Sequence, residues 1–505
     1  MAKTMLKRGA GILMPVSSLP SPYGIGTFGA CAYEFADKLV KARQSYWQVL
    51  PLGPTSYGDS PYQSFSAFAG NPYFIDLDVL KEEGLLTKEE IESCYWCDRE
   101  DEVKYDAVCY YRFPLLKKAF ERSRFRETKE YETFCQENSG WLEDYALYMA
   151  LKGHFNQEEW LNWEEPIRRR EPEAVAAYKA ELSEEMDYWK FLQFKFYGQW
   201  DKLRAYVNEK GIQIIGDIPI YVALDSADVW VHPELFQLDP ETLKPLKVAG
   251  VPPDAFSETG QLWGNPLYDW NSLEKTDFAW WRDRMKAAAR LYDVVRIDHF
   301  IGVVQYYSIP YGAEDGRTGE WRKGPGEKLT KAVNEAAGKT KIIAEDLGYV
   351  TDSVRQLVKD SGFPGMKVLE FAFDSRDSGC ASDYLPHNYP ENCVAYTGTH
   401  DNETIKGWYA SITAQERKLA RDYLCDSCTP ASRLHMSFIS LIMRSQARMC
   451  IIPLQDYMGL DNDCRINTPS TVGTNWRWRL LPGQMSDPLV KTISSVTLRY
   501  GRWNW

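Results

Sequence analysis

The chain has 505 residues, of which 44% are hydrophobic and 14% aromatic, and its formal net charge is −12. This hydrophobic content is ample for a large core, and the length suits two or three domains or one long α/β barrel. An acidic chain without a run of Lys and Arg argues against nucleic acid or an anionic membrane as a partner. We find no apolar stretch of about 20 residues, so we expect no membrane span.

The first residues and the cysteines favour an intracellular protein. Residues 1–8 contain no apolar core of a secretion signal, which favours the cytoplasm. The 11 cysteines are an odd number scattered along the chain, as expected for free thiols. Two Cys-x-x-Cys pairs, Cys94/Cys97 and Cys425/Cys428, have the spacing of a four-cysteine zinc site. They lie far apart without knuckle-like glycines, so ordinary cysteines are the favoured interpretation and no metal is expected.

Short apolar runs bounded by turn residues recur eight times and predict eight strands. From the third strand onward, amphipathic patterns predict helices between them, which indicates right-handed crossovers and a parallel sheet. Eight such strands close naturally into a (β/α)8 barrel, which typically needs about 250 residues. The predicted strands are 11–16, 46–51, 213–219, 293–298, 341–346, 366–373, 393–399 and 450–455. The predicted helices include 194–210, 280–291, 325–337, 352–361, 414–424 and 432–446.

The residues beyond this minimum must be insertions in the barrel. We expect residues 1–505 to form a single catalytic α/β unit, a TIM barrel with two insertions. Residues 77–189, rich in Glu, Lys, Trp and Tyr, are predicted to form a helical subdomain between the second and third strands. Residues 222–276, with two consecutive prolines, are predicted to form a loop-rich insertion after the third strand that lines the active site.

Carboxylates lie at or just beyond five predicted strand ends. Because barrel active sites are built at the carboxyl ends of the strands, acids at this end of several strands favour catalysis. Helix N-capping is the structural alternative, and it is equally open for Asp217 and Asp456. For Asp298, Glu345 and Asp401 we predict catalytic roles. Three such acids suit chemistry on a sugar acetal, which needs an acid, a nucleophile or base, and a further anchor.

Basic residues adjoin these acids. His299 and His400 stand directly next to them, and imidazole hydrogen-bonds sugar hydroxyls or stabilises developing charge. Arg296 lies two residues before Asp298 and therefore on the same strand face. A cation there would keep the aspartate ionised as a nucleophile.

One motif is discounted. Residues 24–29 fit G-x-G-x-x-G, but a dinucleotide site requires this motif to follow a strand directly and to open a helix. Residues 17–23, with two prolines, intervene. The glycines are better explained by a tight loop that lines a ligand site.

The chain resembles the 4-α-glucanotransferases called amylomaltases or disproportionating enzymes, glycoside hydrolase family 77 of the α-amylase superfamily. The resemblance runs nearly end to end and is weakest over about residues 80–190. The matching segments are VRIDHF at 295–300, IAEDLG at 343–348, YTGTHDN at 396–402, GILMPVSSLP at 11–20, WQVLPLGPT at 47–55, GDSPY at 58–62, GVPPD at 250–254, SETGQLWGNP at 257–266, NTP at 467–469 and NWRWR at 475–479.

The resemblance implies a role for each matched site residue. Asp298 is implied as the nucleophile, Glu345 as the general acid/base, and Asp401 as the residue that holds sugar hydroxyls and stabilises the transition state. It also implies that no metal or organic cofactor is needed. The residues implied to bind the glucan are Tyr62, Asp217, Asp254, Trp263, Asn265, Arg296, His299, His400 and Asn467.

Some positions depart from the family pattern: Ile301 where Arg is frequent, Ala255 where some members carry Tyr, and Ser470 where Gly is usual. None removes a catalytic group, but they leave product size and ring formation open.

The resulting prediction is a cytoplasmic 4-α-glucanotransferase acting on maltooligosaccharides and amylose, without nucleic acid or membrane partners, as a monomer or weak homo-oligomer. A retaining α-glucan hydrolase on the same barrel and an inactive glucan-binding protein are the alternatives.

Overall fold

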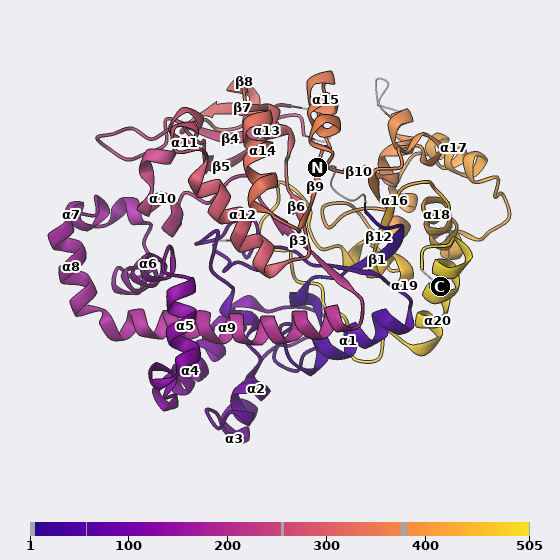
Figure 1. Ribbon diagram of the computed structural model, residues 1–505. Coiled ribbons are helices and arrows are strands. Elements are labelled where there is room, and N and C mark those ends of the chain that lie inside the picture. Colours follow the sequence, from indigo (N-terminus) through magenta and orange to yellow (C-terminus); the bar gives the residue numbers. More distant parts are fainter. Residues whose placement is uncertain (1–5, 57, 254–256, 375–380, 504–505) are drawn as a thin grey trace.

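The computed structural model describes residues 6–56, 58–253, 257–374 and 381–503, and an eight-stranded parallel sheet lies at its centre (Figure 1). The strand order is β10-β11-β12-β1-β2-β3-β6-β9. Each of the eight predicted strands is found in it. The strands are β1 (Gly9–Leu13), β2 (Tyr46–Gln48), β3 (Gln213–Ile218), β6 (Val294–Ile297), β9 (Lys341–Ala344), β10 (Gly365–Val368), β11 (Cys393–Tyr396) and β12 (Met449–Pro453).

A short seam between β9 and β10 brings the two ends of this sheet together. The Ala344 amide donates to the Pro364 carbonyl at 3.0 Å. An Asp346 side-chain oxygen accepts from the Met366 amide at 2.7 Å. A Cβ at position 365 would lie 2.5 Å from the same carboxylate, so glycine is needed there. The sheet is thus a nearly closed barrel, and the predicted fold class is confirmed.

The strands are shorter than predicted at their carboxyl ends. Residues 369–373, predicted as strand, form a short 3-10 helix, and residues 397–399 lie beyond the end of β11. Apolarity predicted the buried interior of each run, as expected for parallel strands covered on both faces. It did not predict where the chain turns out of the sheet.

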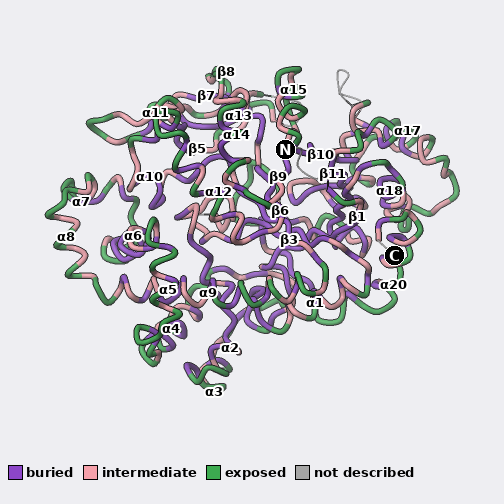
Figure 2. The backbone as a smooth tube through the Cα atoms, viewed as in Figure 1, coloured by how far each residue is buried: buried purple, intermediate pink, exposed green. Residues whose placement is uncertain are grey.

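The six predicted helices are present, and the first begins 11 residues earlier than expected, at Ser183. They cover the outside of the barrel (Figure 1), and all but α18 have exposed residues on their outer faces (Figure 2). They are α9 (Ser183–Glu209), α12 (Ala279–Leu291), α14 (Glu327–Ala336), α15 (Asp352–Ser361), α17 (Ala414–Leu424) and α18 (Leu434–Met443). Further helices are α1 (Ala30–Lys41), α10 (Ala227–Val231), α11 (Trp270–Lys275), α13 (Ile301–Val304), α16 (Ile405–Ser411), α19 (Leu454–Met458) and α20 (Asp487–Arg499).

Residues 77–189 contain a group of helices on one side of the barrel (Figure 1). A buried cation joins this group to the segment after β3. Lys152 is 2% exposed and donates to Asp225 at 2.7 Å, and the Tyr148 hydroxyl donates to the same carboxylate at 2.6 Å. The helices are α2 (Leu77–Glu82), α3 (Lys88–Glu92), α4 (Tyr105–Arg122), α5 (Lys129–Glu137), α6 (Leu142–His154), α7 (Glu165–Arg168) and α8 (Pro172–Glu181).

A second, antiparallel sheet of four strands lies beside the barrel and was not predicted. Its order is β5-β4-β7-β8, with β4 (Lys247–Val251), β5 (Gln261–Pro266), β7 (Gln305–Pro310) and β8 (Glu320–Lys323). It combines strands from the segment after β3 with a hairpin inserted after β6 (Figure 1).

Two further observations concern the described residues. None of their helices is both long and apolar enough to cross a membrane. Their cysteines are free, and they contain no group of three or more His, Cys, Asp or Glu arranged to hold a metal ion.

Candidate active site

Neighbouring strands bring Asp298 and Glu345 to the same end of the barrel. In the β6–β9 pair, Ile297 is opposite Ala344, and each acid is the residue directly after its strand. The Glu345 amide donates to the Ile297 carbonyl at 3.1 Å. The parallel register therefore fixes both acids side by side at adjacent strand ends, although they are 47 positions apart in sequence.

Arg296 connects two of the predicted site acids. Its Nη2 atom lies 2.9 Å from an Asp298 oxygen, and its Nη1 atom lies 2.6 Å from an Asp217 oxygen. The guanidinium is 3% exposed. Burial alone would lower the pKa of Arg296, but the two carboxylates outweigh it and raise the pKa. The guanidinium thus fixes the direction of the Asp298 carboxylate, which is itself 27% exposed.

Glu345 occupies a less exposed position, at 7%. One of its oxygens accepts from the His299 amide at 2.6 Å and the other from the Leu347 amide at 2.9 Å. Burial raises the pKa of Glu345 well above its ordinary value and the Asp298 charge adds to this, while Arg296 and the two amides oppose it. The balance favours the protonated acid, as proton donation requires.

His299 is held in an unusual backbone conformation, with φ of 49°. Left-handed backbone is uncommon for a non-glycine residue, and here it aims the His299 amide at Glu345. Its ring meets the Trp263 ring edge-on at 4.8 Å. Burial lowers the pKa of His299 to about 4, so the imidazole is neutral at physiological pH. Its buried Nε2 atom has no hydrogen-bond partner among the described residues.

Asp401 lies on the loop after β11, with its side chain 40% exposed. One oxygen is 3.1 Å from His400 Nε2, and the other accepts from Asn467 at 2.6 Å. Burial would raise the pKa of Asp401, but these two partners outweigh it and lower the pKa to about 2. Arg465 donates to the Asp401 carbonyl at 2.6 Å and so holds the loop in place.

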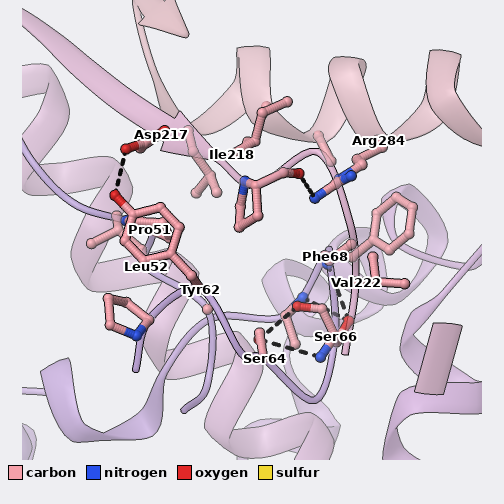
Figure 3. A pocket seen from close by; sticks show the side chains of 18 of the residues that line it. Pro51, Leu52, Tyr62, Ser64, Ser66, Phe68, Asp217, Ile218, Val222 and Arg284 are labelled. Atoms are coloured by element: carbon pink, nitrogen blue, oxygen red, sulfur yellow. Dashed lines mark hydrogen bonds between the residues drawn. The ribbon is translucent and has the colours of Figure 1, made fainter. Parts of the chain in front are cut away.

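Tyr62 connects Asp217 to His400. Its hydroxyl donates to Asp217 at 2.7 Å, and its ring stacks on His400 with 5.1 Å between centroids. Asp217 is 1% exposed and touches the site through Tyr62 and Arg296. Figure 3 shows this contact beside a cavity bounded on its far side by Arg284, which donates to the Pro219 carbonyl.

Asn265, on β5, and Gln63, on the loop after β2, join two segments that border the site. Gln63 donates to the Asn265 side chain at 3.1 Å, and Asn265 donates to the Val222 carbonyl at 2.8 Å. Asn265 is thus largely buried within the loop framework. Asp254, another predicted glucan contact, lies outside the described residues.

Sequence reasoning gave no role to Trp476 or Arg465. The Trp476 ring lies 5.8 Å from Tyr62 and 6.0 Å from His400, completing an aromatic group beside Asp401. Trp476 stands in a matched segment, NWRWR, and an aromatic residue in a polar loop was the available signal. Arg465 had no comparable signal.

The barrel and the site together define a class of enzyme, a (β/α)8 protein suited to retaining chemistry on sugars. Its site has an accessible carboxylate in the position of a nucleophile, a protonated acid beside it, and a further acid that is ionised. The family model described as 4-alpha-glucanotransferase matches residues 14–484. A 4-alpha-glucanotransferase of Clostridium butyricum is 49% identical, over 97% of this chain and all of its own length. One of Streptococcus pneumoniae is 45% identical, over 99% of this chain and 98% of its own length.

Among solved structures, the amylomaltase of Streptococcus agalactiae in complex with acarbose superposes with a TM-score of 0.94 at 42% identity, covering 99% of this chain and all of that one. The chain therefore belongs to the 4-α-glucanotransferase family. The predictions of its family, fold and 4-α-glucanotransferase activity are confirmed.

Proposed function

We propose that this site moves a segment of an α-1,4-glucan onto the 4-hydroxyl of another glucan, or of glucose, through a covalent glycosyl-enzyme. The observation that carries the proposal is the pairing at adjacent strand ends. Asp298 is 27% exposed and fixed by Arg296, while Glu345 is buried and favours its protonated form. A retaining glycosidase-type reaction needs a protonated carboxyl group that donates a proton and a second, accessible carboxylate that attacks the sugar.

In the first displacement, Glu345 gives its proton to the bridging oxygen of an α-1,4 bond. An Asp298 oxygen attacks the anomeric carbon, and the carbon–oxygen bond breaks with its electron pair on the departing 4-oxygen. The Arg296 contact at 2.9 Å leaves the second Asp298 oxygen free to attack. The product is a glycosyl ester of Asp298 and a shortened glucan with a new 4-hydroxyl.

In the second displacement, the ionised Glu345 takes a proton from the 4-hydroxyl of an acceptor glucan. That oxygen attacks the anomeric carbon, and the ester bond to Asp298 breaks. Two inversions at one carbon retain its configuration. The amides of His299 and Leu347 support Glu345 while it is ionised, between the two steps.

We assign the remaining residues to binding and transition-state stabilisation. Asp401, with its pKa of about 2, is ionised throughout and accepts hydrogen bonds from sugar hydroxyls. The neutral His299 ring has an unsatisfied buried nitrogen that suits another hydroxyl. Asp217 acts by orienting Tyr62 and Arg296. The substrates are maltooligosaccharides and amylose, and cytoplasmic location and a monomeric or weakly oligomeric state stay predictions.

Transfer rather than hydrolysis requires that water be kept from the ester until an acceptor arrives. The segment at 58–62 and strand β5 border the site, and Gln63 connects them. It donates to the side chain of Asn265 and to the carbonyl of Trp263, at 3.1 and 3.4 Å. This connection supports a covered site in which the acceptor sugar displaces water.

A time course with maltotriose tests the proposal. Transfer makes glucose and longer chains while the number of reducing ends stays constant. A steady rise in reducing ends would instead establish the hydrolase, and absence of turnover would favour a glucan-binding protein. The same product analysis on Glu345→Gln should show both products lost together.

A further inference from the structure

An aromatic pair, the half-buried Trp321 on the antiparallel sheet and the exposed Tyr349 on a neighbouring loop, lies outside the site described above. This sheet has two different faces because successive residues of a strand point to opposite sides. Ala249 belongs to the main core, whereas Val248, Tyr307 and Ile309 form a separate small hydrophobic cluster. Trp263, which contacts His299, packs on the main core. The sheet thus separates the main core from a second, smaller apolar cluster.

Trp321 stands on the edge strand of this second face. Strand register places it opposite Tyr307, and Tyr307 opposite Gly250. The Tyr307 ring, 6% exposed, meets the Trp321 ring edge-on at 5.3 Å with an interplanar angle of 66°. Trp321 is therefore supported from behind by a buried ring, so its own plane is fixed before any ligand arrives.

Tyr349 reaches this surface from the loop that follows the proposed acid/base. Its ring stacks on Trp321 at 5.7 Å and 26°, and it is 66% exposed. Leu347, two residues earlier, packs on the main core. The loop thus has one side chain in the core and presents the other as a broad aromatic surface. Tyr349 is four positions after Glu345, and four residues span at most about 14 Å, so the two Cα atoms lie within that distance.

We propose that Trp321 and Tyr349 form a distal binding site for α-1,4-glucan chains that extend beyond the catalytic cleft. This rests on the proposed function, since it requires that long glucans occupy that cleft. Tyr and Trp rings offer apolar faces to the C–H surfaces of sugars, together with a polar tip for their hydroxyls. Continuity with the Glu345 loop favours a substrate chain over a protein partner as the occupant.

The test compares long and short substrates in Tyr349→Ala. We expect KM for amylose to rise about threefold to tenfold, as for loss of one aromatic stacking contact, with KM and kcat for maltotriose within about twofold. Trp321→Ala should act in the same direction. Loss of the Trp321 ring also removes a contact from the small cluster, so the melting temperature of Trp321→Ala is measured in parallel. If this variant is destabilised, the conclusion rests on Tyr349→Ala.

Tyr110→Ala is the matched control. Tyr110 is 73% exposed on α4, in the helical segment away from this sheet, so its loss should change neither substrate's KM. An unchanged amylose KM in Tyr349→Ala would overturn the distal site. An equal rise in KM for maltotriose would also overturn it. A changed sedimentation coefficient of Tyr349→Ala with an unchanged amylose KM would overturn it too, because it would assign the aromatic pair to self-association. If the unaltered protein made no glucose and longer chains from maltotriose, the proposed function itself would fail, which is a separate result.

Discussion

Asp298 and Asp456 follow buried strands of the same barrel, yet their surroundings differ. Asp298 is 27% exposed and bound by Arg296. Asp456, beyond β12, is 1% exposed and accepts from the Thr397 hydroxyl and the Ile405 amide. Burial raises the pKa of Asp456 to about 7. Both acids follow strands, so position alone does not separate them; exposure and a bound cation distinguish Asp298, the proposed nucleophile, from Asp456.

Asp456 nevertheless serves the site indirectly. Its two partners lie at either end of the segment that contains His400 and Asp401. Glu370, 6% exposed, lies against the same segment: its amide donates to the Thr397 carbonyl, and a Cβ on Gly398 would come 2.7 Å from its side chain. The buried acids hold the loop, whereas Asp298 and Asp401, which are more exposed, are among the acids that we propose to act on the substrate.

The largest expected difference separates Asp298→Asn from Asp456→Asn. Removing the proposed nucleophile should lower kcat for maltotriose at least about a thousandfold, because the proposal assigns ester formation to this carboxylate alone. Asp456→Asn keeps the hydrogen-bonding shape of the protonated acid and should lower it no more than about tenfold. Steady-state kinetics measure both, and Asp283→Asn, on an exposed face of α12, is the control. Comparable losses in the two variants would break the distinction.

Glu345→Gln should cost about a hundredfold to ten-thousandfold on maltotriose, the usual range for loss of general acid–base catalysis. A donor with a fluoride leaving group needs no proton, so ester formation from it should suffer much less. Because the pKa of Glu345 is raised well above 4.5, the unaltered protein should stay active well above pH 4.5. It should lose activity as pH rises through the raised pKa, where Glu345 gives up its proton. If activity still falls at high pH in Glu345→Gln, the fall belongs to the ionisation of another group. Glu335→Gln, at an exposed ion pair, is the control.

Asp456→Asn should also change how stability depends on pH. The folded pKa of Asp456, about 7, lies above its ordinary value of 3.8, so the folded state binds this proton more tightly. Its contribution to stability is complete below about pH 4 and is lost as pH rises to about 7. Asparagine cannot ionise, so the variant should gain about 1–3 kcal/mol relative to the unaltered protein between pH 5 and pH 8. Urea unfolding at both pH values measures this, and an unchanged difference would contradict it.

The smallest effect is expected from Thr397→Val, which removes one hydroxyl from the loop support. A buried Asp456 oxygen loses its donor, at a cost of about 1–3 kcal/mol in unfolding free energy. The fall in kcat should be smaller than that of Asp456→Asn, because the hydrogen bond from the Ile405 amide to Asp456 remains. In the Asp456→Asn background the cost should differ by at least about 0.5 kcal/mol, as expected for side chains in contact. Strict additivity would show that the two do not interact, and Thr492→Val, on α20, is the control.

The sequence predicted the barrel because buried parallel strands are continuous apolar runs, such as 293–298 and 450–455. It placed Asp298, Glu345 and Asp401 at one end because strand polarity does so in this fold. It could not show that Asp217 is enclosed beneath Tyr62, because enclosure depends on side chains from distant segments. It also missed β4 and β5, where Gly250, Pro252 and Gly260 favour loops and where cross-strand pairing, not local propensity, makes the sheet.

The most direct test of the central claim is peptide mass spectrometry of Glu345→Gln after reaction with α-maltosyl fluoride. The first displacement needs no acid with this donor, and the second is slowed because Gln cannot accept the acceptor's proton. We predict that a maltosyl ester accumulates on the peptide containing Asp298 and disappears in Asp298→Asn. An adduct on Asp401 or another residue, or no adduct while turnover continues, would contradict the account.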